Sequence, residues 1–130
     1  MNLTLHHGEG LPQIRSATDE GILINDKLHT GALLVSADNL IENWPLASAD
    51  ELSEELVRPI LELKPDLFIL GTGSVQVFPD PKISWLLLSA GIGMEVMTTP
   101  AACRTFNVVM SEGRNAVAAL LPLKPAATGG

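Results

Sequence analysis

Short apolar segments separated by turn residues fill the first third of the chain. One of them alternates apolar and polar side chains, and the next ones are apolar runs of about four residues, with Asp-Glu-Gly and Asn-Asp turn sequences between them. Connections this short join antiparallel neighbours, so these segments predict β-hairpins. We expect strands at residues 14–18, 21–24, 27–30, 32–35 and 39–42.

The remainder of the chain alternates helical and extended patterns. Ser48 and Glu51 have the spacing of a capping box, and apolar residues then recur at helical spacing. Asp80-Pro81 and Thr99-Pro100 each place a capping residue before a proline, which is a common start of a helix. We therefore expect helices from Ser48, over 81–90 and over 99–112, and strands at 67–70, 93–97 and 116–121.

Apolar strands separated by helices predict right-handed crossovers and a parallel core. The continuous apolar run at 67–70 is typical of a strand covered on both faces. We therefore predict an α/β fold: a three-layer domain with a mixed central sheet flanked by helices and an N-terminal β-hairpin layer. Residues 1–130 are expected to form one domain with an ordered core at about 14–121. The termini are rich in glycine, proline and small residues, so we expect them to be flexible.

Composition and charge narrow the classes of partner. The chain has 130 residues, long enough for one hydrophobic core, and carries 15 acidic against 8 basic side chains, a net charge of −7. This balance argues against nucleic acid, which selects basic patches. No apolar stretch approaches the roughly 20 residues that a membrane helix needs, and the N-terminus has no secretory pattern, so we expect no membrane span and a cytoplasmic location. The single cysteine excludes an internal disulfide.

Two loops at strand ends carry the most suggestive local chemistry. Gly71, Thr72 and Gly73 directly follow the apolar strand 67–70, and Thr98 and Thr99 follow the next strand. If these strands are neighbours, both loops open at one edge of the sheet, where α/β proteins bind small molecules. A pocket for a small molecule or an anion is one interpretation. The other is a tight turn and ordinary helix capping, and the GTGSVQ sequence matches neither a dinucleotide fingerprint nor a phosphate loop.

Polar residues on and near the predicted helix 99–112 are weaker candidates. Arg104 and Asn107 share one helix face by their spacing and are candidate ligand-binding residues. Glu95 lies within a predicted strand, where a lone carboxylate would be costly to bury, so it either sits at an edge or needs a cation, for which Arg104 and Arg114 are the candidates. Glu95 and Arg114 are therefore candidates for a buried polar cluster or a structural ion pair. Cys103 lies on an apolar helix face and is expected to be a core residue.

No catalytic or metal-binding constellation is found. His6, His7 and His29 do not form a ligand pattern with any cysteine or carboxylate, and no serine stands in a nucleophile-elbow sequence. We therefore predict no catalytic residues, no metal and no cofactor, and a non-enzymatic protein is favoured over an enzyme.

The predicted helix 81–90 has an excess of apolar residues. Ile83, Leu86, Leu87 and Ala90 form a normal core stripe, whereas Trp85 and Leu88 form a second stripe on another side. Tryptophan is enriched at binding hot spots. A helix that is apolar nearly all round is either sandwiched within the fold or faces a partner. In a domain of this size we favour a surface for a protein partner or for self-association over a fully sandwiched helix.

The motifs occur in an order that resembles a family of small single-domain proteins, which includes the mitochondrial respiratory complex I assembly factor three and bacterial relatives of unassigned function. The matching segments are 31–35, Trp44, 65–73, 91–97, 99–107 and 112–114. The family's shared residues match here as Gly71, Thr72, Gly73, Glu95, Thr98, Ala102, Arg104, Asn107, Glu112 and Arg114. The resemblance implies a three-layer α/β domain and no established enzyme activity. It also implies an assembly role with a partner protein, as for the mitochondrial member.

Two hypotheses about function follow. The first is a non-enzymatic, assembly-factor-like interaction module that uses Trp85 and Leu88. The alternative is a small-molecule or anion-binding protein, or an unrecognised enzyme, with its pocket at the loops 71–73 and 98–99. The lack of a targeting presequence favours a bacterial, cytoplasmic member.

Overall fold

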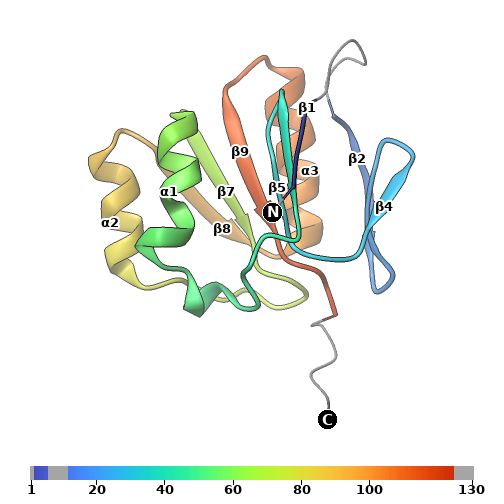
Figure 1. Cartoon of the computed structure of the whole chain (residues 1–130), viewed down its shortest axis with the longest axis horizontal. Coiled ribbons are helices and arrows are strands. Elements are labelled where there is room, and N and C mark those ends of the chain that lie inside the picture. The colour runs from blue at the N-terminus through green and yellow to red at the C-terminus, as the bar shows by residue number, and fades with distance from the viewer. Residues whose placement is uncertain (1, 6–11, 125–130) are drawn as a thin grey trace.

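The computed structural model describes residues 2–5 and 12–124 (Figure 1). Strands and helices alternate in its second half, as the sequence predicts. The elements are β1 (Asn2–Leu5), β2 (Ile14–Thr18), β3 (Gly21–Ile24), β4 (Lys27–His29), β5 (Leu33–Val35), β6 (Asn39–Glu42), a 3-10 turn (Ala49–Glu51), α1 (Glu54–Leu63), β7 (Leu67–Gly71), α2 (Pro81–Ser89), β8 (Gly93–Met97), α3 (Thr99–Ser111) and β9 (Ala116–Leu120). Most of the terminal residues that we predict to be flexible lie outside the residues that the structure describes.

The described strands form two sheets. The larger has six strands in the order β1-β6-β5-β9-β7-β8, and the smaller is β2-β3-β4. Strand β7 is parallel to both β8 and β9, whereas β5 pairs antiparallel with β9 and β6. The larger sheet is therefore mixed, and its parallel half is built by the crossovers through α2 and α3, as expected for strands separated by helices.

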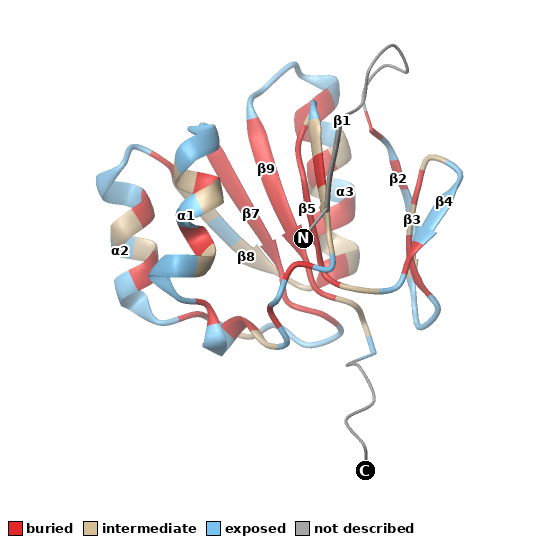
Figure 2. Cartoon of the chain, viewed as in Figure 1, coloured by how far each residue is buried: buried red, intermediate tan, exposed pale blue. Residues whose placement is uncertain are grey.

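The elements stack in three layers (Figure 1). Helices α1 and α2 cover one face of the large sheet, and α3 covers the other face together with the small sheet. Side chains alternate accordingly along β7: Phe68 and Leu70 pack towards α1 and α2, whereas Leu67 and Ile69 pack towards α3. The central strands are buried on both faces, as Figure 2 shows. This is the three-layer α/β fold with a mixed sheet and an added hairpin layer that the sequence predicts.

One helix begins later than its capping pattern indicates. Ser48 makes no side-chain capping bond and precedes only a 3-10 turn. Helix α1 is capped by Ser53, whose Oγ accepts from the Leu56 N–H at 3.3 Å. Leu52 is extended and buried, so it interrupts the helix between the two serines. The prediction that a helix begins at Ser48 is therefore wrong. The predicted helix start at Asp80 is confirmed, because the Asp80 carboxylate accepts from the Lys82 N–H.

Strand β1 pairs with β6 and was not expected from the sequence.

The three helices of the described part are short, and none is long and apolar enough to cross a bilayer.

Candidate functional site

The two strand-end loops meet at one edge of the large sheet. Strands β7 and β8 are parallel neighbours, so their carboxyl ends lie side by side. The Thr72 N–H donates to the Met97 carbonyl at 2.9 Å, and the Thr99 N–H donates to the Gly73 carbonyl at 2.8 Å. The loops are therefore bonded directly to each other.

Thr99 fills the space between these loops. Its side chain is fully buried, and its hydroxyl accepts from the Gly73 N–H at 2.8 Å and donates to the Leu121 carbonyl at 2.6 Å. One side chain thus ties together the ends of β7, β9 and the start of α3. Its hydroxyl proton is already donated inside the protein, so Thr99 is a structural link rather than an open ligand.

The glycine at the end of β7 allows this close packing. A Cβ added to Gly71 would lie 2.9 Å from the Ala102 Cβ, closer than real Cβ atoms approach, and 3.0 Å from the Thr99 Cα, which is also unusually tight. Helix α3 therefore rests directly on the Gly71 backbone. Thr98 is half-buried and makes no side-chain capping bond.

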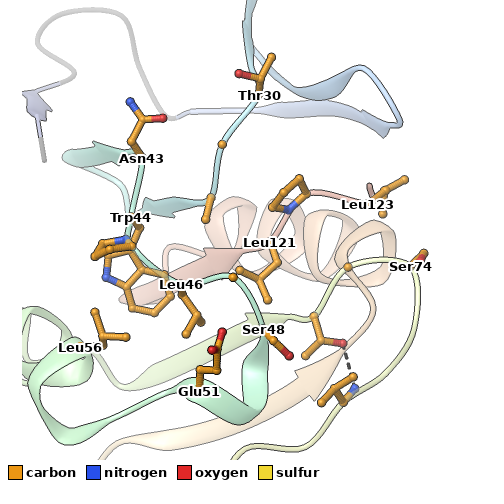
Figure 3. A pocket seen from close by; sticks show the side chains of 18 of the residues that line it. Thr30, Asn43, Trp44, Leu46, Ser48, Glu51, Leu56, Ser74, Leu121 and Leu123 are labelled. Atoms are coloured by element: carbon orange, nitrogen blue, oxygen red, sulfur yellow. Dashed lines mark hydrogen bonds between the residues drawn. The ribbon is translucent and has the colours of Figure 1, made fainter. Parts of the chain in front are cut away.

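A cavity of about 780 Å³ opens on the side of this loop that faces α1 (Figure 3). Thr72 and Gly73 line it, together with the segment after β6, the residues just before β5 and Leu121. Most of its wall is apolar, as Trp44, Leu46 and Leu56 show in the close-up. The polar groups include the Ser48 hydroxyl and the Glu51 carboxylate.

No lysine, arginine or histidine is among the residues described as lining the cavity. A bound phosphate or carboxylate would therefore find no cationic side chain, and it would be repelled by Glu51. The chemistry of the wall suits an uncharged, largely apolar molecule.

The Thr72 hydroxyl shapes one wall of the cavity. It donates to the Val75 carbonyl at 2.6 Å and accepts from the Val77 N–H at 3.1 Å. These two bonds fold the segment after β7 into a tight turn, and both valines line the cavity. Thr72 therefore acts on the cavity by holding its wall.

Trp44 lies in the opposite wall with 2% of its surface exposed. Its indole Nε1 is the one buried side-chain nitrogen or oxygen in the described part of the chain without a hydrogen-bond partner. An unpaired buried donor costs about 1–3 kcal/mol. The nitrogen has almost no accessible surface, so an acceptor can reach it only if the wall moves.

Comparisons with known proteins agree with the resemblance noted in the sequence. The model of the family described as a protein of unknown function (DUF498/DUF598) matches residues 14–121. The chain belongs to this family. It is 30% identical over 111 residues to the bovine NADH dehydrogenase [ubiquinone] 1 alpha subcomplex assembly factor 3, covering 84% of the chain and 60% of that protein. The chain thus spans less than two thirds of the length of this relative.

Solved structures share the fold of this chain. The Xanthomonas campestris protein XCC1710 is 33% identical, with a TM-score of 0.82 over 95% of this chain and 93% of that one. A Bordetella pertussis protein, described as an Mth938-like domain, is 25% identical, with a TM-score of 0.78 over 96% of this chain and 94% of that one. The resemblance to a family that includes complex I assembly factor three is confirmed.

In this DUF498/DUF598 protein, the candidate residues of α3 do not reach the cavity. Arg104 is exposed to solvent and is absent from the described lining. Asn107 is bonded to the small sheet: its amide donates to the Ile14 carbonyl at 2.8 Å and accepts from the Ile14 N–H at 3.0 Å. Asn107 therefore pins β2 to α3. The spacing that places Arg104 and Asn107 on one face is correct, but this face points away from the loops at 71–73.

The prediction that Glu95 and Arg114 form a buried polar cluster is wrong. Both residues are exposed, and the nearest acidic partner of Arg114 in the described chain is Glu112 at 4.0 Å. Strand β8 lies at the edge of the large sheet, and α3 covers mainly the neighbouring strands, so the carboxylate of Glu95 remains in water.

The remaining titratable candidates are structural. Cys103 is a buried core residue, and burial raises the pKa of its thiol to about 12 against the smaller lowering effect of Arg104. His29 is buried, and its Nδ1 lies 2.8 Å from Glu42, which links β4 to β6. His6 and His7 lie outside the described residues. Within the described part, no group of three or more histidine, cysteine or acidic side chains is placed to hold a metal ion.

The segment at 43–48 forms a cavity wall that the sequence pattern did not predict. Trp44 stands before a proline, which was the available signal of an extended, positioned residue. That signal does not say which loop the tryptophan faces, because the facing loop is about thirty residues later in the chain.

Proposed function

We propose that this protein is a non-enzymatic, assembly-factor-like module that binds a protein partner through the outer face of α2. Relatives that carry the name of a complex I assembly factor support the class of function. The observation that carries the proposal is the exposure of two large apolar side chains on one helix.

Trp85 is 72% exposed and Leu88 is 59% exposed. We call these two residues the α2 face. They stand three positions apart, so they lie together on the outer side of the helix, while Ile83 and Leu87 are buried against the sheet. Phe78, in the loop that leads into α2, is also exposed. An exposed tryptophan with an apolar neighbour is typical of a binding hot spot.

We expect Trp85→Asp to weaken partner binding at least tenfold, because it removes a large apolar anchor and places a charge in a desolvated contact. The measurement is the amount of partner retained by the tagged protein from its host cell, and the dissociation constant once that partner is purified. Val108→Asp is the matched control. Val108 is 55% exposed on α3, on the other side of the large sheet, so the same change there should leave binding intact.

Equal retention by both aspartate variants would contradict the role of the α2 face. A change of oligomeric state in Trp85→Asp alone would identify the partner as a second copy of the chain.

A second candidate function is the binding of a small molecule in the cavity beside Thr72 and Gly73. Its volume of about 780 Å³ is within the range of ligand sites in proteins, and its wall has the apolar character of such sites. The absence of a basic side chain in the described wall favours an uncharged ligand over the anion considered from the sequence.

A panel of uncharged aromatic compounds, with inorganic phosphate for comparison, tests this function by thermal shift. We expect an uncharged compound that binds to raise the Tm increasingly as its concentration exceeds Kd, and phosphate to have no effect. Leu56→Trp fills the cavity and should abolish the shift, whereas Arg104→Ala, outside the cavity, should preserve it. No response to any uncharged compound, or an undiminished response in Leu56→Trp, would contradict this function.

A further inference from the structure

We infer that the partner adds an extended strand to the open edge of β8, next to the α2 face, with a basic side chain opposite Glu95. This inference rests on the proposed function, since it specifies what kind of segment the α2 face helps to bind. It is carried by the hydrogen-bonding direction of β8, by the side chains along it and by charge.

The backbone of β8 has a free side. β8 is the last strand in the order of the described large sheet and pairs only with β7 there. The Gly93 N–H donates to the Asp66 carbonyl, and the Met97 carbonyl accepts from the Thr72 N–H, so these residues point towards β7. Alternate residues point the opposite way. Met94 and Val96 therefore direct their N–H and carbonyl groups out of the sheet.

One bond on this side shows that the edge accepts an amide. The Gln76 side chain donates from Nε2 to the Val96 carbonyl at 2.9 Å. Within the described part of the chain, no other group bonds to the outward side of β8, which leaves both backbone groups of Met94 and the Val96 N–H available. Such unpaired groups are a template for another strand.

The side chains of β8 separate an apolar side from a polar one. Met94 and Val96 pack on the side of the sheet that α2 covers, and the Ser84 hydroxyl lies 3.6 Å from the Met94 sulfur. Leu88 stands one turn after Ser84 on the same side of the helix, so the α2 face continues the apolar side of β8. Glu95 projects to the opposite side of the sheet and is exposed.

A strand added to the edge of β8 would have one side facing the apolar region near α2 and the other facing Glu95. Side chains alternate along any strand, so its residues in one phase would lie on the side of Leu88, and those in the other phase would lie across from Glu95. Opposite charges directly across two strands attract and like charges repel. The segment that fits is therefore extended, with apolar residues alternating with basic ones.

Charge disfavours a second copy of this chain as the occupant. A symmetric antiparallel pair of β8 strands centred on Glu95 would set two carboxylates against each other, and each copy carries a net charge of −7. A basic segment of a different protein is attracted instead.

The experiment uses the full chain and a seven-residue peptide of alternating valine and lysine, with a peptide of the same composition in scrambled order as control. Binding is followed by NMR titration, and the edge is monitored by amide hydrogen exchange at Met94 and Val96. We expect the alternating peptide to bind more tightly than the scrambled one and to slow exchange at both amides. Val96→Pro removes the outward N–H while leaving the bonds to β7, since proline is tolerated at such edge positions.

We expect Val96→Pro to weaken binding at least tenfold relative to Val96→Ala, which shortens the side chain but keeps the N–H. Glu95→Lys should weaken binding severalfold, because it sets like charges across the strands.

If Val96→Pro and Val96→Ala bind alike, or if Met94 and Val96 are not protected, strand addition is wrong. Binding that is lost in Trp85→Asp but insensitive to Val96→Pro would refute strand addition and leave the proposed function standing. If the peptide binds Trp85→Asp and Val96→Pro as tightly as the wild-type chain, both strand addition and the α2 face are refuted for this class of partner. If Val96→Pro does not fold, exchange protection in the wild-type chain decides.

Discussion

Thr99→Val should lower the free energy of unfolding by about 2–4 kcal/mol. Valine keeps the shape of the side chain but lacks the hydroxyl, which leaves the Gly73 N–H and the Leu121 carbonyl without their partner in a buried position. Each unpaired buried group costs about 1–3 kcal/mol, and the hydroxyl of Thr99 that pairs them is itself fully buried. Urea denaturation with an unchanged m-value measures the effect.

Thr98→Val is the matched control for this prediction. Thr98 is the adjacent residue and stands at the N-cap of α3, yet its side chain makes no capping bond. We expect a change within about 0.5 kcal/mol, as for a substitution that removes no buried bond. Equal destabilisation by the two substitutions would show that the hydroxyl of Thr99 is not what links the three segments.

Gly71→Ala should destabilise the protein by about 1–3 kcal/mol, because the added methyl overpacks a contact between β7 and α3. The new carbon would stand 2.9 Å from Ala102 and 3.0 Å from the backbone of Thr99, so the helix start itself must move. The same movement would stretch the bonds of Thr99. Denaturation measures the loss of stability, and the chemical shifts of residues 98–102 report the displacement of the helix.

Gly93→Ala provides the comparison. Gly93 begins the neighbouring strand, and a Cβ there would make only ordinary contacts at 3.6 Å and 3.7 Å with Asp66 and Leu67. We expect that substitution to change stability by no more than about 0.5 kcal/mol. If Gly71→Ala is equally mild, α3 does not rest on the β7 backbone as closely as the structure describes.

Thr99 and Gly71 explain why the pocket predicted between the two strand-end loops is not where the observed cavity lies. The loops at 71–73 and 98–99 do meet, as adjacent parallel strands require. The space between them is filled by Thr99 and by the contact of Ala102 with Gly71. The cavity lies on the other side of the Thr72-Gly73 backbone, where a loop from the antiparallel half of the sheet faces it.

Local patterns predicted the elements well where propensity and packing agree. Asp80-Pro81 begins a helix because the carboxylate and the fixed proline conformation both favour it there. The pattern at Ser48 failed because capping chemistry recurs at Ser53, and burial of Leu52 in an extended conformation decided between the two serines. Strand β1 depends on pairing with β6, about forty residues away, and short segments carry no signal of such pairing.

The sequence by itself determined the α/β class, the order of strands and helices from residue 14 onward, and the excess of apolar side chains at Trp85 and Leu88. These features follow from periodicity and local conformational preference, which act over a few residues. Only the tertiary structure decided that Glu95 is exposed at a sheet edge, that Thr99 is a buried link and that Trp44 faces the loop after β7. Each of these depends on which strands are neighbours and which face a helix covers, and such contacts join residues far apart in the chain.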